Sequence, residues 1–195
     1  MQSVKREVSL AMGIKQTGMI CGYGSYSERI EGYIQSARAA GADNAIAVTP
    51  DEIVFDPRTV IKCMFGCGDW GKGLTCPSVD GFLNLDEWEK LLRMYKNVII
   101  IHSTVKKTAQ TISFSLEKQA YLDGDVLSFS MSDCALCGKC AGFSGESCRN
   151  PQQARPAFHS VGIDVFATAE KLGLPLKPLK DEGETENWYS AVWLN

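Results

Sequence analysis

The chain has 195 residues, of which 45% are hydrophobic and 22% are charged, values ordinary for a soluble globular protein. Its 20 basic and 23 acidic residues give a net charge of −3, so it lacks the basic excess of proteins that bind nucleic acid or an anionic membrane. No stretch approaches the ~20 apolar residues of a membrane-spanning helix, and the first twenty residues lack the continuous apolar region of a signal peptide. We therefore expect a cytoplasmic protein, in whose reducing surroundings clustered cysteines indicate metal or redox chemistry rather than disulfides.

The length fits one domain, which we place at residues 25–195 after an N-terminal lead-in at residues 1–24. A helix is predicted after Ser25, because Ser25 and Glu28 have the spacing of a capping box and Gly41 supplies a C-terminal stop. Its apolar residues share one helical face: Ile30, Tyr33, Ile34 and Ala37. Residues 45–48 and 52–55 resemble two short strands, which we expect to form a hairpin.

The first cysteine group has the pattern C-x3-C-x8-C-P and consists of Cys63, Cys67, Cys76 and Pro77. The glycine-rich segment from Gly66 to Gly81 is not expected to form a regular element. A proline after a ligand cysteine fixes φ and removes a competing donor, which favours a metal site. One interpretation is a second iron–sulfur cluster with Cys21 as fourth ligand. Others are a cluster with three thiolates and an open iron for a small molecule, or a zinc site completed by Cys21 or a histidine. The alternative without a metal is that these cysteines pack beneath the glycine-rich loop.

The middle of the chain predicts a helix, a strand, a second helix and a second strand. Asn84 and Glu87 have capping-box spacing before an apolar stripe that extends to Tyr95, and residues 98–101 resemble a fully buried strand. A long helix over residues 105–120 is predicted to stop at Gly124, and a strand at residues 126–130 leads toward the second cysteine group.

The second cysteine group has the pattern C-x2-C-x2-C-x7-C-x2-P, formed by Cys134, Cys137, Cys140, Cys148 and Pro151. Three cysteines at two-residue gaps allow one loop to place three sulfurs around a metal centre, and the pattern is close to that of bacterial ferredoxins. Zinc sites normally use two separated cysteine pairs. We therefore predict a [4Fe–4S] cluster here, with zinc as the alternative and reduced structural cysteines or disulfides as the least favoured one.

The remaining elements complete a predicted α+β fold. We expect a short helical turn within residues 155–162, a helix from Asp164 to Leu172, a solvated loop at residues 180–186 and a closing strand at residues 188–193. The expected architecture is one mixed or mainly antiparallel sheet with helices on one face, with two cysteine-rich metal-binding loops at one end of the sheet.

Several isolated polar residues are weaker candidates for a role in the site. His102 and His159 are each more often surface or satisfied core residues than ligands, and Asp69 is more often a turn residue. Lys139 and Arg149 flank the second cysteine group, where cations would favour a reduced cluster, but they equally fit a solvated surface. Arg155 fits either an anion-binding residue or a structural anchor.

Both cysteine groups, followed by Arg155-Pro156 and Gly162-Ile-Asp-Val165, resemble a cysteine-rich family of predicted metal-binding proteins, a domain of unknown function found mostly in anaerobic prokaryotes. The resemblance covers residues 37–195 and implies metal sites at the seven clustered cysteines, without implying a reaction. The chain departs from the family after Arg155, where it has Pro156-Ala-Phe-His-Ser160 instead of a segment with a carboxylate.

These patterns predict a cytoplasmic iron–sulfur protein that relays electrons to a redox partner protein and binds neither nucleic acid nor membrane. The first alternative is a zinc-stabilised adaptor that docks on a redox or methyl-transfer enzyme. The second is an enzyme that uses an open iron at the three-cysteine site.

Overall fold

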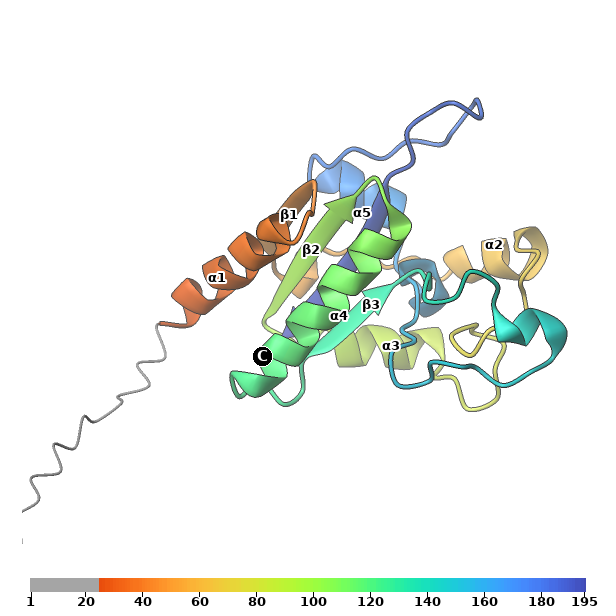
Figure 1. The fold of residues 1–195 in the computed structure, drawn as a ribbon, viewed down its shortest axis with the longest axis horizontal. Coiled ribbons are helices and arrows are strands. Elements are labelled where there is room, and N and C mark those ends of the chain that lie inside the picture. The colour runs from red at the N-terminus through yellow and green to blue at the C-terminus, as the bar shows by residue number, and fades with distance from the viewer. Residues whose placement is uncertain (1–24) are drawn as a thin grey trace, which may run out of the picture.

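A single four-stranded sheet forms the centre of the computed structural model, which describes residues 25–195 (Figure 1). The strands are β1 (Asn44–Val48), β2 (Asn97–Ser103), β3 (Phe129–Ser132) and β4 (Trp188–Leu194). Their order across the sheet is β1-β2-β4-β3, and each adjacent pair is antiparallel. The predicted α+β class and the antiparallel sheet are therefore confirmed.

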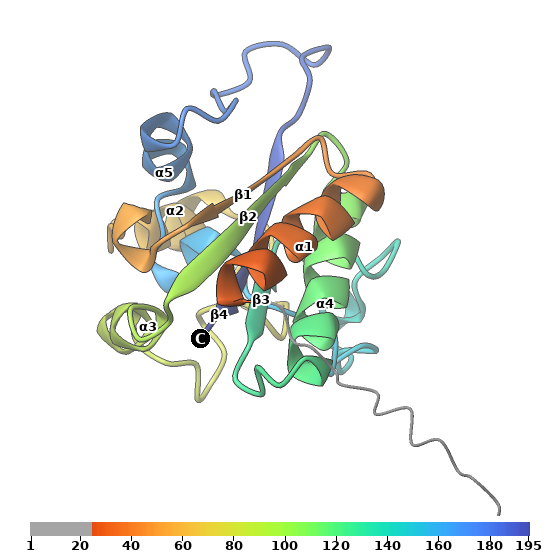
Figure 2. The ribbon, with the colours of Figure 1, turned by 90° about the vertical axis from the view of Figure 1, so that its left-hand side faces the viewer.

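Helices cover both faces of this sheet (Figure 2). The two longest helices, α1 (Tyr26–Ala39) and α4 (Lys106–Leu122), pack together on one face, against Ile99 and Ile101 of β2. Val98 and Ile100 point to the opposite face, which is covered by α3 (Leu85–Leu92), α5 (Val165–Lys171) and a 3₁₀ turn at Phe158–Val161. The sequence predicts helices on one face only. Successive residues of β2 point to opposite faces of the sheet and are apolar on both, so both faces must be shielded from water.

The predicted signals at helix ends are confirmed. The Ser25–Glu28 capping box opens α1, and the Asn84–Glu87 capping box opens α3, where the Glu87 amide donates to Asn84 Oδ1 at 2.9 Å. Gly124, the second residue after α4, has φ +97°, a conformation that residues other than glycine rarely adopt. The helix boundaries therefore coincide with local capping signals.

The predicted hairpin within residues 45–55 is wrong. β1 pairs with β2, in the register Ile46–Ile100, and the residues that follow β1 form a 3₁₀ turn at Pro50–Glu52. Thr49 and Glu52 cap this turn, and proline suits its first position, so the chain turns away from the sheet instead of returning along it. The predicted strand at 126–130 is also shifted, to Phe129–Ser132.

The strand directions determine where the cysteine loops lie. Since β2 and β3 are both antiparallel to β4, they run the same way, and their C-terminal ends meet at one end of the sheet, near the start of α4. Both cysteine loops project from this end (Figure 1). At the other end, Arg29 of α1 donates to the carbonyl oxygen of Asp123, directly after α4. None of the helices in the described part of the chain is long and apolar enough to cross a membrane.

Candidate metal centre

The first cysteine loop begins within a helix. Cys63 lies in α2 (Thr59–Gly66) and is buried, whereas Cys67 caps the helix C-terminus and is exposed. The helix ends at Gly66, and from Cys67 to Gly81 the chain has no helix or strand, as predicted for this glycine-rich segment. From Cys67 the chain continues as successive turns to Cys76, whose amide donates to the Gly73 carbonyl oxygen at 3.1 Å. The glycines permit these turns and bring Cys76 back toward α2.

The second cysteine loop connects β3 to the 3₁₀ turn at Phe158–Val161. Cys134 follows β3 after one residue and is exposed, and the other three cysteines are partly buried. Between Cys140 and Cys148 the chain forms a short 3₁₀ turn at Ala141–Ser144. This turn accommodates the longer last gap of the cysteine pattern.

The two loops enclose one cavity of about 210 Å³. All seven described cysteines line it, and none of them forms a disulfide: Cys63, Cys67, Cys76, Cys134, Cys137, Cys140 and Cys148. Within residues 25–195, no three cysteine, histidine or acidic side chains converge closely enough to hold a single metal ion. Cys21, the predicted eighth ligand, lies outside the described residues. The fold thus brings both cysteine groups to one cavity, as seven separate thiols around its wall.

Hydrogen-bond partners of the sulfurs favour thiolates. Cys76 Sγ accepts a hydrogen bond from the Gly71 amide at 3.3 Å and lies 3.0 Å from Ser78 Oγ. Burial opposes ionisation of Cys76, but these contacts outweigh it and lower the pKa of the thiol. Cys137 Sγ accepts from the side-chain amide of Asn150 at 3.1 Å. Donors aimed at sulfur are the outer-shell contacts that orient and tune ligand thiolates.

Cys63 shows the opposite electrostatic effect. Burial, followed by the negative charge that Cys67, Cys76 and Asp133 can carry, raises the pKa of the Cys63 thiol. Several thiolates in one cavity therefore repel each other unless a cation compensates them. A metal supplies that compensation, because it binds thiolates and releases their protons. The donor set and its electrostatics fit a thiolate-bound metal centre.

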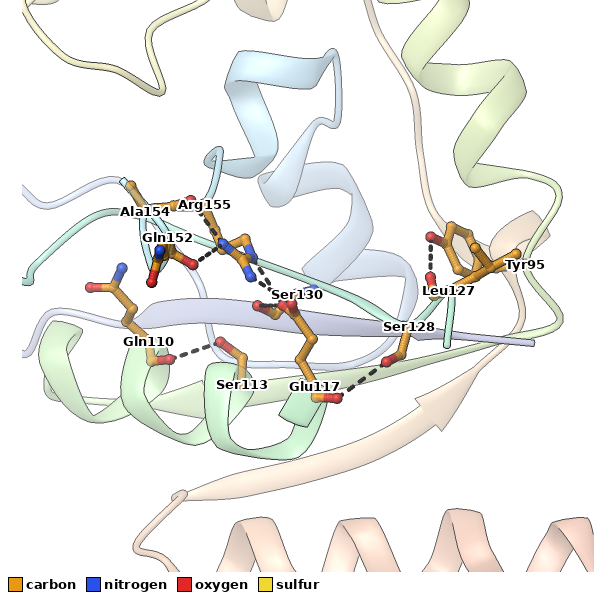
Figure 3. Close-up of polar contacts among 10 residues, drawn as sticks. All are labelled: Tyr95, Gln110, Ser113, Glu117, Leu127, Ser128, Ser130, Gln152, Ala154 and Arg155. Atoms are coloured by element: carbon orange, nitrogen blue, oxygen red, sulfur yellow. Dashed lines mark hydrogen bonds and ion pairs between the residues drawn. The ribbon is translucent and has the colours of Figure 1, made fainter. Parts of the chain in front are cut away.

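Helix α4 holds the second cysteine loop at both ends, and Figure 3 shows the contacts of Arg155 beyond the end of the loop. At the start of the loop, Gln110 Oε1 accepts the amide of Ala135 at 2.6 Å. Beyond its end, Arg155 donates to both carboxylate oxygens of Glu117, and the Ser130 amide donates to the same carboxylate at 2.7 Å. The Arg155 side chain is only 15% exposed, and it also donates to two carbonyl oxygens of its own segment. Of its two predicted roles, Arg155 therefore has that of a structural anchor.

The other polar candidates divide between the cavity and the core. Asp69, Arg149 and His159 line the cavity. His102 lies in the core, where its Nε2 is 2.8 Å from Asn187 Oδ1 and its ring stacks on Tyr189. Lys139 is exposed and is absent from the cavity wall.

Sequence patterns alone did not identify four polar residues near the cavity: Lys106, Gln110, Asp133 and Asn150. Asp133 directly precedes Cys134 and Asn150 lies two residues after Cys148, and this proximity in the chain was the available signal. Lys106 and Gln110 are contributed by α4, and only the packing of α4 against β3 and β4 brings them near the cysteines.

The fold and the cavity together define an α+β protein with a cysteine-lined candidate metal centre. The chain belongs to the family described as "Predicted metal-binding protein (DUF2284)", whose profile matches residues 47–194. This match confirms the family resemblance and includes all seven cysteines of the cavity, whereas Cys21 precedes it. Comparisons with curated proteins and with solved structures gave no significant match.

Proposed function

We propose that this protein is a cytoplasmic iron–sulfur protein that relays electrons. In this proposal one [4Fe–4S] cluster is held by Cys134, Cys137, Cys140 and Cys148. A second cluster or metal is held by Cys63, Cys67 and Cys76. The observation that carries the proposal is the meeting of seven free thiols at one cavity, on two loops of different spacing. A bound cluster supplies a site that accepts and returns one electron.

The number and spacing of the thiols favour iron–sulfur chemistry over zinc. A structural zinc takes four ligands, normally as two cysteine pairs, whereas this cavity offers seven thiols and three of them lie at two-residue gaps. Asn150 and the Gly71 amide donate to sulfur, and Lys106 and Arg149 line the same cavity. These donors and cations favour the more negative, reduced form of a cluster and so raise its potential.

The cavity also supports a second candidate function, an enzyme with an open coordination position at the three-cysteine set. Its wall carries Lys106, Arg149 and His159 beside the thiols, which are groups that can orient a small anion or move a proton. In this case an added ligand perturbs the spectrum of one metal centre only. An electron relay shows no such response, and a zinc-stabilised adaptor is colourless.

The electron-relay proposal includes a redox partner protein and excludes nucleic acid and membrane as partners. The formal net charge of −3 supports the exclusion of polyanions. The partner must approach the end of the sheet that carries the cysteine loops, since the opposite end is separated from the cavity by the length of α4.

Metal analysis of the protein purified without oxygen tests this proposal. About eight irons and eight sulfides per chain would support two [4Fe–4S] clusters, and about four of each would support only the cluster at the second loop. A colourless protein with bound zinc would contradict electron relay. Cys137→Ser and Cys67→Ser remove one thiol from each group, and Ser144→Ala is the matched control, because Ser144 is exposed in the second loop and lies outside the cavity wall.

A further inference from the structure

The backbones of the two cysteine loops touch at one point. A Cβ atom at Gly142 would lie 1.7 Å from the carbonyl oxygen of Lys72 and 2.8 Å from its carbonyl carbon. Gly142 is not among the glycines with positive φ, so the contact alone requires glycine at this position. No other residue allows the loops to approach this closely.

Each partner of this contact lies between two cysteines of its own loop. Lys72 is between Cys67 and Cys76 in the first loop, and Gly142 is between Cys140 and Cys148 in the second. The Lys72 ammonium group also lies over the ring of Phe143, 5.7 Å from its centre. The main cavity adjoins this contact, and a second space of about 200 Å³ that reaches Cys140 and Cys148 adjoins it as well. The two loops therefore pack as one unit.

The two loops differ in how firmly the rest of the protein holds them. The second loop is attached to α4 at both ends, through Gln110 and through the Glu117–Arg155 ion pair. In the first loop, every hydrogen bond found for residues 67–81 joins partners within residues 63–82. α2 holds the start of this loop, and for residues 67–81 the packing against the second loop at Gly142 is a main determinant of position.

We infer that the seven thiols form one jointly assembled metal site, in which the second loop positions the first through the Gly142–Lys72 contact. This inference rests on the part of the proposed function that assigns metal to both cysteine groups. The thiols line the cavity without converging, so metal binding must draw the loops inward. Because no gap separates the loops at Gly142, a shift of one loop displaces the other, and metal at one group changes the affinity of the other.

The two groups differ in which of them can load alone, and this difference can be observed. Thermodynamic linkage makes the coupling factor equal in both directions. The second group starts from a loop that α4 already holds, so it remains loaded when the first group is empty. In the first group only Cys63 has such support, from α2, so the positions of Cys67 and Cys76 depend on the second loop.

Two glycine variants of the full chain test the inference, because both keep every cysteine. Gly142→Ala places a methyl group on the Lys72 carbonyl, whereas Gly138→Ala, in the same loop, has no atom within 4 Å of the new Cβ and no positive φ. Each protein is titrated with ferrous iron and sulfide under anaerobic conditions, and separately with Zn²⁺. We expect Gly138→Ala to load like the wild type. In Gly142→Ala we expect the second group to load and the affinity of the first to fall by about tenfold or more, the size typical of lost supporting contacts.

Equal loading of both groups in Gly142→Ala and Gly138→Ala would overturn the inference. If Gly142→Ala fails to fold by circular dichroism, the double variant Cys134→Ser/Cys137→Ser replaces it, with Cys67→Ser/Cys76→Ser as its counterpart. We then expect little metal at the first group in the former and metal at the second group in the latter; equal occupancy of these two groups would contradict the inference. A wild type that takes up only zinc contradicts electron relay but leaves the coupling measurable, and a wild type that binds no metal contradicts both.

Discussion

Glu117 and Arg155 form a bidentate ion pair that joins the second half of α4 to the segment after the last cysteine. Arg155 Nε lies 2.9 Å from Glu117 Oε2, and both side chains are 15% exposed. The guanidinium group also lies over the rings of Phe114 and Phe129. The pair therefore fixes the position of the second cysteine loop from a point outside the cavity.

Replacement of Glu117 should destabilise the protein without removing a metal ligand. Glu117→Gln leaves the buried Arg155 charge without its counterion, which costs about 3 kcal/mol in the free energy of unfolding. Urea unfolding of the metal-free protein measures this. Glu182→Gln is the control, because Glu182 is exposed in the loop before β4. Equal stability of the two variants would contradict the anchoring role.

The same carboxylate predicts how stability depends on pH. Burial opposes ionisation of Glu117, but hydrogen bonds from Arg155 and Ser130 outweigh it and lower the pKa below its ordinary value of 4.5. The unfolded chain then binds this proton more readily than the folded one, so the contribution of Glu117 is complete above pH 4.5 and is lost as the pH falls through the lower pKa of the folded state. Urea midpoints measured from pH 7 to pH 3 should fall less steeply in Glu117→Gln than in the wild type.

Cys21 is a predicted ligand whose contribution a single substitution can test. Residues 21 and 25 are at most about 14 Å apart along a fully extended chain. α1 starts near Asn97 and Asp123, beyond the far end of α4, and the 17 residues of α4 span about 25 Å. We therefore expect Cys21→Ser to keep the metal content of the wild type, whereas Cys76→Ser loses metal from the first group. Loss of metal in Cys21→Ser would contradict this expectation and show that Cys21 takes part in metal binding.

Asn150 should tune a centre bound to Cys137. Asn150→Ala removes the hydrogen bond to Cys137 Sγ, worth about 1 kcal/mol, and that is about 40 mV for one electron. In the iron-loaded protein we expect a lower reduction potential by this order, with unchanged iron content, as measured by redox titration of the visible spectrum. The control is Ser147→Ala, an exposed neighbour. An unchanged potential would indicate that this hydrogen bond does not act on the centre.

Signals within a few residues of one another predicted the local elements of the fold. The Ser25–Glu28 and Asn84–Glu87 pairs and the stop at Gly124 give the helix ends, because capping depends on neighbours in the chain. Pairing between strands was less predictable. β1 pairs with a strand about fifty residues later, and proximity in the sequence wrongly favoured residues 52–55. Strand pairing depends on burial of both sheet faces, which no short segment encodes.

In the candidate site, too, the sequence predicted local features but not those that depend on tertiary packing. The two cysteine spacings predicted seven of the groups that meet at the cavity. Gln110 was not predicted, because its role depends on where α4 packs, and Gly142 looked like any other glycine of a loop. The close approach of two loops at Gly142 is a tertiary contact, and only the three-dimensional structure reveals it.

Neither hydrophobic core of the domain contains a cysteine. The sheet and its helices therefore do not depend on metal for their packing, and the cysteine loops form a separate region at one end. We expect removal of metal to increase amide hydrogen exchange in the loops while β2 and β4 stay protected. Such a protein can gain, lose or exchange its metal during its lifetime in the cell without passing through the unfolded state, where chains are exposed to aggregation and degradation.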